Sequence, residues 1–248
     1  MPSFAKDPQL RRFLPWGFLL TGILILVVRG CSFTEFESGQ HSYLFDRGGQ
    51  KFPYLLYLPE SYQPDRKLPL LVYLHGASLR GHRIERVKQY GPTRWVDNRK
   101  DFPMAVLSPQ CFPEADWSDM TWVPHLIDYI TAELGLDEDR IYLTGISLGG
   151  SGAWHFAARN PERFAAVAPL CGYGNPKDAE HLRDIPVWVF HGEKDRVVPL
   201  SASSRMVDAV RRAGGNITFT VLPNAWHSIV KEVYYQDQLY DWLLEQRR

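Results

Sequence analysis

A serine flanked by glycines is the residue in this sequence whose setting best suits covalent chemistry. Ser147 lies in the stretch GISLGG, between a short apolar segment at residues 141–144 and a longer segment at residues 150–159. The first segment predicts a strand and the second a helix, so the glycines mark a tight turn between them. Such a turn presents the serine hydroxyl at the carboxyl edge of a sheet, near a helix N-terminus that stabilises negative charge. The spacing therefore predicts that Ser147 is a nucleophile.

A serine hydroxyl attacks efficiently only when a base removes its proton, and an acid usually orients that base. Asp195 follows a later predicted strand in the stretch GEKDRVVP, where Glu193 is a competing acid. His227 follows the last predicted strand, in the stretch PNAWHS. The chain order Ser, Asp, His is that of one known triad arrangement and differs from the chymotrypsin and subtilisin orders. The sequence therefore predicts a serine nucleophile with a histidine base and a carboxylate.

Acyl transfer through a serine also needs two donors for the oxyanion. The amide of Leu148, directly after the nucleophile, is one candidate. The other donor should follow an early strand, and the apolar residues 70–75 are such a segment, ending in the stretch HGAS. Because Gly76 lets the backbone approach a substrate closely, the amide of Ala77 is the predicted second donor.

Several ordered stretches of the chain resemble the phospholipase/carboxylesterase branch of the α/β-hydrolase superfamily, and dienelactone-hydrolase-like and feruloyl-esterase-like proteins are similar in outline. These stretches, within residues 52–247, are LVYLHGAS, VLSPQC, IYLTGISLGGSGAWHFAARNPERFAAVAPLCG, VWVFHGEKDRVVP and LPNAWHS. The resemblance implies a catalytic triad of Ser147, Asp195 and His227. It also implies oxyanion amides at Ala77 and Leu148 and no metal or organic cofactor.

Three details bear on what the resemblance implies. The pattern HGxxDxxVP around Asp195 favours this acid over Glu193. Dienelactone hydrolases proper carry cysteine at the position of Ser147, which argues against that particular activity. Trp226 stands where relatives often have glycine before the catalytic histidine, and its ring either narrows the substrate site or packs beneath it.

Hydrophobic patterning predicts the scaffold that must hold these residues. Apolar segments alternate with amphipathic ones, which predicts a mostly parallel central sheet with helices on both faces and an antiparallel start. The resemblance implies that this sheet is that of the α/β-hydrolase fold. Only residues 171–186 separate two late strands at the point where lids usually enter, so no substantial lid domain is expected. The predicted strands are 42–46, 52–58, 70–75, 104–108, 141–144, 164–170, 187–191 and 217–222, and the predicted helices are 122–134, 150–159, 201–213 and 239–246.

Composition limits the class of protein. The chain has 248 residues, with 28 Lys and Arg against 28 Asp and Glu, and this zero net charge argues against a nucleic-acid partner. Three cysteines are too few for a disulfide framework, and no Cys-x-x-Cys or His-x-x-x-His pair predicts a metal site. Residues 51–248 are predicted to form one catalytic domain, and residues 32–50 a tether and first strand.

The N-terminus has the pattern of a targeting segment. Arg11 and Arg12 precede the uncharged run FLPWGFLLTGILILVV at residues 13–28, which is typical of a signal peptide or a membrane anchor in residues 1–31. Gly30-Cys31 resembles the end of a bacterial lipobox, although Arg29 is unusual there. Cleavage, lipidation at Cys31 and a retained helix remain alternatives, and each predicts an exported protein in the cell envelope, membrane-anchored, periplasmic or extracellular.

These observations predict a serine carboxylic-ester hydrolase that acts through an acyl-enzyme on small or exposed acyl esters, free or borne on a polymer. The alternatives are a serine peptidase of prolyl-oligopeptidase type and a non-catalytic hydrolase-fold binding module. Aromatic residues beyond strand ends are the candidates for substrate binding, with ordinary packing as the alternative for the tryptophans. They are Trp117, Trp122, Tyr173 and Trp226.

Overall fold

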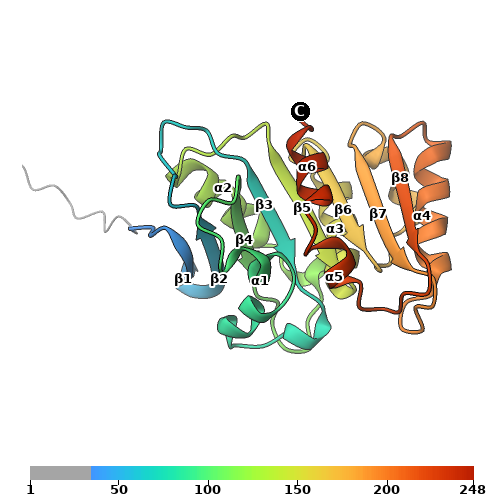
Figure 1. The fold of residues 1–248 in the computed structure, drawn as a ribbon, viewed down its shortest axis with the longest axis horizontal. Helices are drawn as coiled ribbons and strands as arrows, with labels where there is room; N and C mark the ends of the chain where they lie inside the picture. Colours follow the sequence, from blue (N-terminus) through green and yellow to red (C-terminus); the bar gives the residue numbers. More distant parts are fainter. Residues whose placement is uncertain (1–34) are drawn as a thin grey trace, which may run out of the picture. The chain divides into compact units, whose positions relative to one another are not determined.

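One sheet of eight strands runs through residues 35–248, the part of the chain that the computed structural model describes (Figure 1). Its strand order is β1-β2-β4-β3-β5-β6-β7-β8. β2 pairs antiparallel with β1 and β4, whereas the other neighbouring pairs in this sheet are parallel, which confirms the predicted arrangement. The strands are β1 Gly39–Arg47, β2 Gln50–Leu58, β3 Leu70–Leu74, β4 Ala105–Pro109, β5 Ile141–Ile146, β6 Ala166–Leu170, β7 Val187–Gly192 and β8 Ile217–Leu222.

Helices cover both faces of the sheet. Residues of α2, α3 and α4 share one hydrophobic cluster with the sheet, and residues of α1, α5 and α6 share another. In Figure 1, α5 and α6 lie in front of the sheet. The helices are α1 Pro92–Val96, α2 Val123–Glu133, α3 Leu148–Arg159, α4 Leu200–Arg212, α5 Val230–Val233 and α6 Gln238–Leu244, with short 3₁₀ segments η1 Ala77–Leu79, η2 Ile84–Gln89, η3 Trp117–Asp119 and η4 Pro176–Leu182.

Strand β3 shows why the central strands are continuous apolar runs. Leu70, Val72 and Leu74 belong to the cluster on one face of the sheet. Leu71 and Tyr73 belong to the cluster on the other face. Successive side chains of a strand point to opposite faces, so a strand covered on both sides must be apolar throughout.

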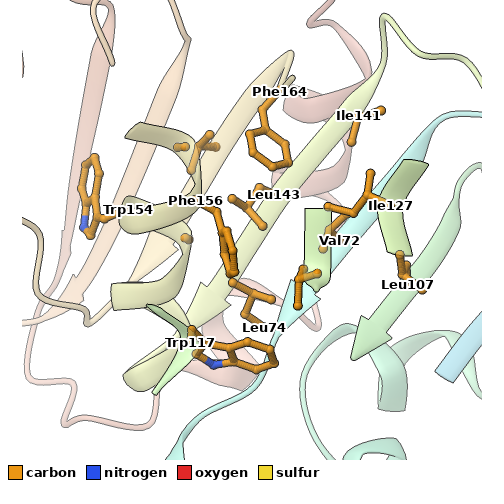
Figure 2. Packing of buried hydrophobic residues seen from close by; sticks show 14 of the residues in the cluster. Val72, Leu74, Leu107, Trp117, Ile127, Ile141, Leu143, Trp154, Phe156 and Phe164 are labelled. Carbon is orange, nitrogen blue, oxygen red and sulfur yellow. The ribbon is translucent and has the colours of Figure 1, made fainter. Parts of the chain in front are cut away.

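Figure 2 shows part of the first cluster, in which strand residues meet the inner faces of two helices. Val72 and Leu143 come from β3 and β5, Ile127 from α2 and Phe156 from α3. Burying one such side chain is worth about 1.5–3 kcal/mol relative to leaving it in water. This packing fixes α3 against β5, and therefore fixes the turn between them, which carries Ser147.

The structure corrects the predicted start of the domain. β1 pairs along its whole length with β2, and Phe36 packs against the core, so the domain starts before residue 51. The link between the two strands is Gly48-Gly49, with φ of 65° and 83°. A two-residue turn with positive φ at both positions suits a tight hairpin, so the first strand predicted within residues 32–50 forms and belongs to the sheet of the catalytic domain.

Two helix starts also differ from the prediction. α3 begins at Leu148, directly after the nucleophile, rather than at residue 150. α4 begins at Leu200 after Pro199, and the side chain of Ser201 does not cap it. Because Pro already has a helix-compatible φ and no N–H to satisfy, the chain enters this helix without a side-chain cap.

Among residues 35–248, no helix is long and apolar enough to cross a membrane. The predicted signal peptide or anchor at residues 1–31, with its candidate lipidation site Cys31, lies outside the described residues. Cys111 and Cys171 are both buried free thiols, as expected from the separation of their strands in the sheet.

Candidate active site

The turn from β5 into α3 holds Ser147 in a conformation that few residues adopt. Its φ is 59° and its ψ is −119°, and its side chain lies at the carboxyl end of the parallel strands. The flanking glycines make this turn sterically feasible. A Cβ on Gly149 would lie 1.8 Å from the carbonyl oxygen of Leu74, and a Cβ on Gly145 would lie 2.3 Å from the carbonyl oxygen of Gly149. Side chains at 145 and 149 are therefore excluded by backbone atoms that cannot move aside.

Two hydrogen bonds connect Ser147 to a histidine and a carboxylate. His227 Nε2 lies 2.9 Å from Ser147 Oγ, and His227 Nδ1 lies 2.7 Å from Asp195 Oδ2. Because a carboxylate only accepts, Nδ1 carries the proton and Nε2 is free to accept the serine proton. The three side chains predicted from the sequence are thus brought together in the order that nucleophilic catalysis requires.

The Asp195 carboxylate is held in place by further donors. Its Oδ1 accepts the amides of Val197 and Val198 at 2.8 and 2.9 Å. Burial raises the pKa of Asp195, but the hydrogen bonds from His227 and from the Val198 and Val197 amides outweigh it, and the pKa lies below its ordinary value. Asp195 therefore stays ionised while it orients His227. The competing acid Glu193 instead accepts the backbone amide of Asn224 at 2.8 Å.

A second histidine contacts the same carboxylate. His191 is fully buried, and its Nε2 lies 3.2 Å from Asp195 Oδ2 and 2.9 Å from the carbonyl oxygen of Val198. Its Nδ1 lies 2.8 Å from Ser203 Oγ. Since both neighbours of Nε2 are acceptors, Nε2 carries the proton and Nδ1 accepts from the serine. Burial lowers the pKa of His191, so this imidazole stays neutral, donates its Nε2 proton to the carbonyl oxygen of Val198 and lies beside the Asp195 carboxylate.

The predicted oxyanion amides begin two segments that start beside the nucleophile. Leu148 opens α3 and Ala77 opens η1, and neither amide has an acceptor among the described residues. A Cβ on Gly76 would lie 3.6 Å from Ser147 Cβ, so the loop before Ala77 runs directly beside the nucleophile. Two free amides at this position can bind developing negative charge on a carbonyl oxygen.

Buried side chains fix the loop that carries Ala77. His75 Nδ1 lies 2.8 Å from the carbonyl oxygen of Gly76, and Nε2 accepts the Cys111 amide at 3.0 Å. Trp117 Nε1 donates to the carbonyl oxygen of His75 at 3.0 Å. Burial lowers the pKa of His75 to about 4, so the ring is neutral at physiological pH and donates through Nδ1. The sequence analysis did not predict that Trp117 supports the loop of Ala77, because residue type alone does not reveal the hydrogen bond from its indole N–H.

A cleft of about 220 Å³ opens over the nucleophile. Its walls include three residues of the predicted site, Ala77, Ser147 and His227. They also include two residues that the motifs did not indicate, Tyr90 and Ser228. Their hydroxyl oxygens lie 2.6 Å apart. Ser228 follows the catalytic histidine, which was a usable signal, whereas Tyr90 reaches the cleft through the irregular η2 segment. The full lining is Gly76, Ala77, Ser78, Tyr90, Ile146, Ser147, His227 and Ser228.

Comparison with known proteins agrees with this fold. The dienelactone hydrolase family model matches residues 120–238, just under half of the chain. A crystal structure of a thermostable esterase aligns with a TM-score of 0.75 and 34% sequence identity, over 84% of this chain and 63% of that one. The butyrate-bound esterase Est2 from Thermogutta terrifontis aligns with a TM-score of 0.64 at 16% identity, over 84% of this chain and 94% of that one, and shows the same fold.

The chain has the α/β-hydrolase fold. Among curated proteins, it is 27% identical over 149 residues to the bifunctional acetylxylan esterase/xylanase XynS20E of Neocallimastix patriciarum, and the match covers 58% of this chain and 21% of that protein. It therefore spans only about a fifth of that relative, and less than two thirds of the thermostable esterase.

The predicted substrate-binding aromatic residues divide into two pairs by their exposure. Trp117 and Trp122 are only 1% and 3% exposed, so the predicted aromatic rim at these positions is wrong. Trp122 stacks on Phe52 with ring centroids 4.5 Å apart, inside the core. Tyr173 and Trp226 are 49% and 52% exposed, and the Arg196 guanidinium lies 5.0 Å from the Trp226 ring centroid. Trp226 thus neither fills the core nor packs beneath the site.

One cluster among the described residues has the spacing of metal ligands. The ligand atoms of Cys171, His191 and Asp195 lie within 4.8 Å of one another. Burial raises the pKa of Cys171 to about 12, so its thiol keeps its proton at neutral pH. The ring nitrogens of His191 and the carboxylate oxygens of Asp195 already take part in the hydrogen bonds described above. The cluster is therefore a support for the catalytic carboxylate rather than a vacant set of metal ligands.

Proposed function

We propose that this α/β-hydrolase is a serine carboxylic-ester hydrolase that works through an acyl-enzyme. The observation that carries the proposal is the continuous connection from Ser147 through His227 to Asp195, with bonds of 2.9 and 2.7 Å. The two unoccupied amides of Ala77 and Leu148 support it, because they supply the charge stabilisation that acyl transfer needs. A binding module would have no use for this combination of groups.

The mechanism follows from the geometry. His227 Nε2 takes the proton of Ser147 as the serine oxygen attacks the ester carbonyl, and Asp195 stabilises the imidazolium that forms. The amides of Ala77 and Leu148 hold the tetrahedral oxyanion, and each contributes about 3 kcal/mol to the transition state. His227 then donates its proton to the leaving alcohol. Water attacks the acyl-enzyme along the same path and regenerates the serine.

The size of the cleft favours small acyl groups. It holds about 220 Å³, and η4 at Pro176–Leu182 is the regular element between β6 and β7, so no lid closes over the nucleophile from that connection. The names of the similar proteins, an esterase and an acetylxylan esterase/xylanase, are consistent with short acyl esters. We therefore favour esters of short acids over long-chain lipids.

Hydrolysis of p-nitrophenyl acetate and p-nitrophenyl butyrate tests this proposal directly. The wild-type chain should hydrolyse both esters, with a higher kcat/KM for acetate. Ser147→Ala should lose at least about 1000-fold in kcat. The matched control is Ser151→Ala, one helical turn away, whose hydroxyl accepts the amide of Tyr173 and donates to the carbonyl oxygen of Ser147 rather than contacting His227. Equal activity of Ser147→Ala and Ser151→Ala would contradict a serine mechanism.

We also propose that the chain is exported and that residues 1–31 direct it to the cell envelope. The basic residues before the sixteen uncharged residues 13–28 support this proposal. The mass of the mature N-terminal peptide separates the three forms. A cleaved peptide, a lipid on Cys31 and an intact N-terminus each give a different mass, and a cytoplasmic protein with an intact N-terminus would contradict export.

A further inference from the structure

Two hydroxyl groups that the mechanism does not use lie in the wall of the catalytic cleft. Tyr90 and Ser228 line this cleft together with Ser147 and His227. The hydroxyl oxygens of Tyr90 and Ser228 lie 2.6 Å apart. Tyr90 comes directly after η2 and Ser228 directly after the catalytic base, so this hydrogen bond joins two distant segments beside the reacting atoms.

The core holds the backbone of Tyr90 in place from both sides. Its carbonyl oxygen accepts the hydroxyl of the buried Thr93 at 2.6 Å, and its amide donates to the carbonyl oxygen of Val87 at 3.3 Å. The next residue, Gly91, has a φ of 71°, and a Cβ there would lie 2.5 Å from the buried Tyr73 ring. This packing presents the Tyr90 phenol to its serine partner before any substrate binds.

The acidities of the two groups set the direction of their hydrogen bond. A phenol is a stronger acid than an aliphatic alcohol, so Tyr90 donates and Ser228 Oγ accepts. The Ser228 hydroxyl has no other hydrogen-bond partner within residues 35–248, so its own proton is available to a group in the cleft. Accepting a hydrogen bond from the phenol also makes the serine hydroxyl a stronger donor.

The catalytic geometry indicates which group receives this proton. His227 Nε2 must protonate the leaving oxygen, so that oxygen lies beside the imidazole when its bond to the acyl carbon breaks. Ser228 is the neighbour of His227 in the chain and lines the same cleft, so its hydroxyl lies on the leaving-group side. Negative charge grows on the leaving oxygen as the bond breaks, and a donor aimed at that oxygen lowers the barrier.

The exposure of the pair sets the size of the effect. Ser228 is exposed and Tyr90 is half-buried in the free enzyme. A water molecule can donate to the leaving oxygen in place of the serine, but it must first be ordered there. The Ser228 hydroxyl is already oriented by Tyr90 and needs no reorganisation. Its advantage over water is therefore moderate, about tenfold in rate, whereas one oxyanion donor contributes about 10²–10³-fold.

We propose that Ser228 is a catalytic residue that donates a hydrogen bond to the leaving-group oxygen, and that Tyr90 is a positioning residue that orients the serine hydroxyl. Ser228 keeps its proton throughout, and the proton that the leaving alcohol gains still comes from His227 Nε2. The inference rests on the proposed ester hydrolysis and adds a dependence on the alcohol. The pair assists esters of weakly acidic alcohols most, because a more basic leaving oxygen accepts a stronger hydrogen bond.

Acetate esters of alcohols that differ in acidity test the inference. All of them form the same acetyl-enzyme, so differences in kcat/KM report on the acylation step. Ser228→Ala should lower kcat/KM about tenfold for ethyl acetate and less than about twofold for p-nitrophenyl acetate, whose leaving oxygen needs little assistance. Tyr90→Phe should show the same pattern with a smaller loss, about 3–5-fold for ethyl acetate. Ser228→Thr keeps the hydroxyl and should recover most of the ethyl acetate value.

The control variant is Tyr73→Phe, which removes a buried phenol hydroxyl that has no partner among the described residues. It should leave both kcat/KM values within about twofold of wild type. Equal losses for the two esters in Ser228→Ala, or no loss for either, would overturn the inference while ester hydrolysis stands. Ser228 is exposed, so its truncation leaves the core intact and stays informative if Tyr90→Phe is unstable. Turnover of both esters that survives in Ser147→Ala would instead remove the proposed function, and the inference with it.

Discussion

The imidazole of His191 and the carboxylate of Asp195 lie side by side at the end of β7, with Nε2 3.2 Å from Oδ2. The same oxygen accepts the proton of the catalytic His227 at 2.7 Å. Asp195 thus contacts two histidines, one buried and neutral, the other its hydrogen-bond donor and open to the substrate cleft. Through Asp195, His191 at the end of β7 is therefore connected to the catalytic base His227, which follows β8.

Replacement of the His191 imidazole should slow catalysis without abolishing it. His191→Leu should lower kcat/KM about tenfold and stability by about 1–3 kcal/mol, because the carbonyl oxygen of Val198 loses its donor and the buried carboxylate loses a polar neighbour. The pKa of Asp195 should rise for the same reason, so the acidic limb of the kcat/KM profile should move to higher pH. His191→Gln keeps an N–H donor and should recover part of the rate. A loss of stability with an unmoved pH profile would show that His191 only packs.

Substitution of the two acids that follow β7, Glu193 and Asp195, should change kcat by very different amounts. Asp195→Asn keeps the shape of the side chain but favours the wrong tautomer of His227, and kcat should fall about 10³–10⁴-fold. Glu193→Gln removes a charge two residues away that contacts only the amide of Asn224 among the described residues, and kcat should change less than about threefold. Kinetics on p-nitrophenyl acetate measure both. A comparable loss in the two variants would mean that the orienting acid is misassigned.

Two buried tryptophans provide a matched test of the oxyanion loop. Trp117→Phe leaves the carbonyl oxygen of His75 without its indole donor, and should cost about 1–3 kcal/mol of stability and lower kcat more than it raises KM. Trp122→Phe removes an indole N–H that has no partner among the described residues, and should leave kcat unchanged. Equal kcat values in the two variants would show that the Trp117 hydrogen bond does not position the loop.

The neutral His75 should make stability depend on pH in a defined window. Its pKa falls from 6.5 in the unfolded chain to about 4 in the folded protein because of burial. Below the unfolded pKa the unfolded state binds the proton and the folded state does not, so stability is complete above pH 6.5 and is lost as pH falls towards about 4. The total loss from this group is about 3 kcal/mol.

Urea unfolding at a series of pH values isolates this contribution. The free energy of unfolding of wild type should fall about 2–3 kcal/mol more than that of His75→Gln between neutral pH and pH about 4.5. The buried His191 and the ionised Asp195 contribute equally to both proteins, so the difference reports on His75. Parallel curves would indicate that His75 titrates normally in the folded state.

Much of the fold was predictable because its signals are local. Continuous apolar runs such as Leu70–Leu74 are buried on both faces of a parallel sheet, and the glycines around Ser147 are required by backbone contacts. Asp195 and His227 were predictable because each follows a strand end, and parallel strands deliver their carboxyl ends to one edge.

Other features depend on contacts that no local pattern encodes. Tyr90 and Ser228 lie 138 positions apart in the chain, and only the tertiary fold brings their hydroxyls together. Trp117 and Trp122 follow a strand end, as exposed substrate-binding residues would, yet their rings are buried. The Gly48-Gly49 turn, by contrast, is a local signal for the hairpin of β1 and β2 that the sequence prediction did not use.

Covalent labelling of the full chain tests the central claim most directly. A fluorophosphonate probe should attach to one residue, identified by peptide mass spectrometry as Ser147, and abolish ester hydrolysis in proportion to labelling. His227→Ala should slow the labelling about 1000-fold or more, because the serine then has no base. An active enzyme that remains unlabelled, or that is inactivated by labelling at a residue other than Ser147, would contradict the assignment of the nucleophile.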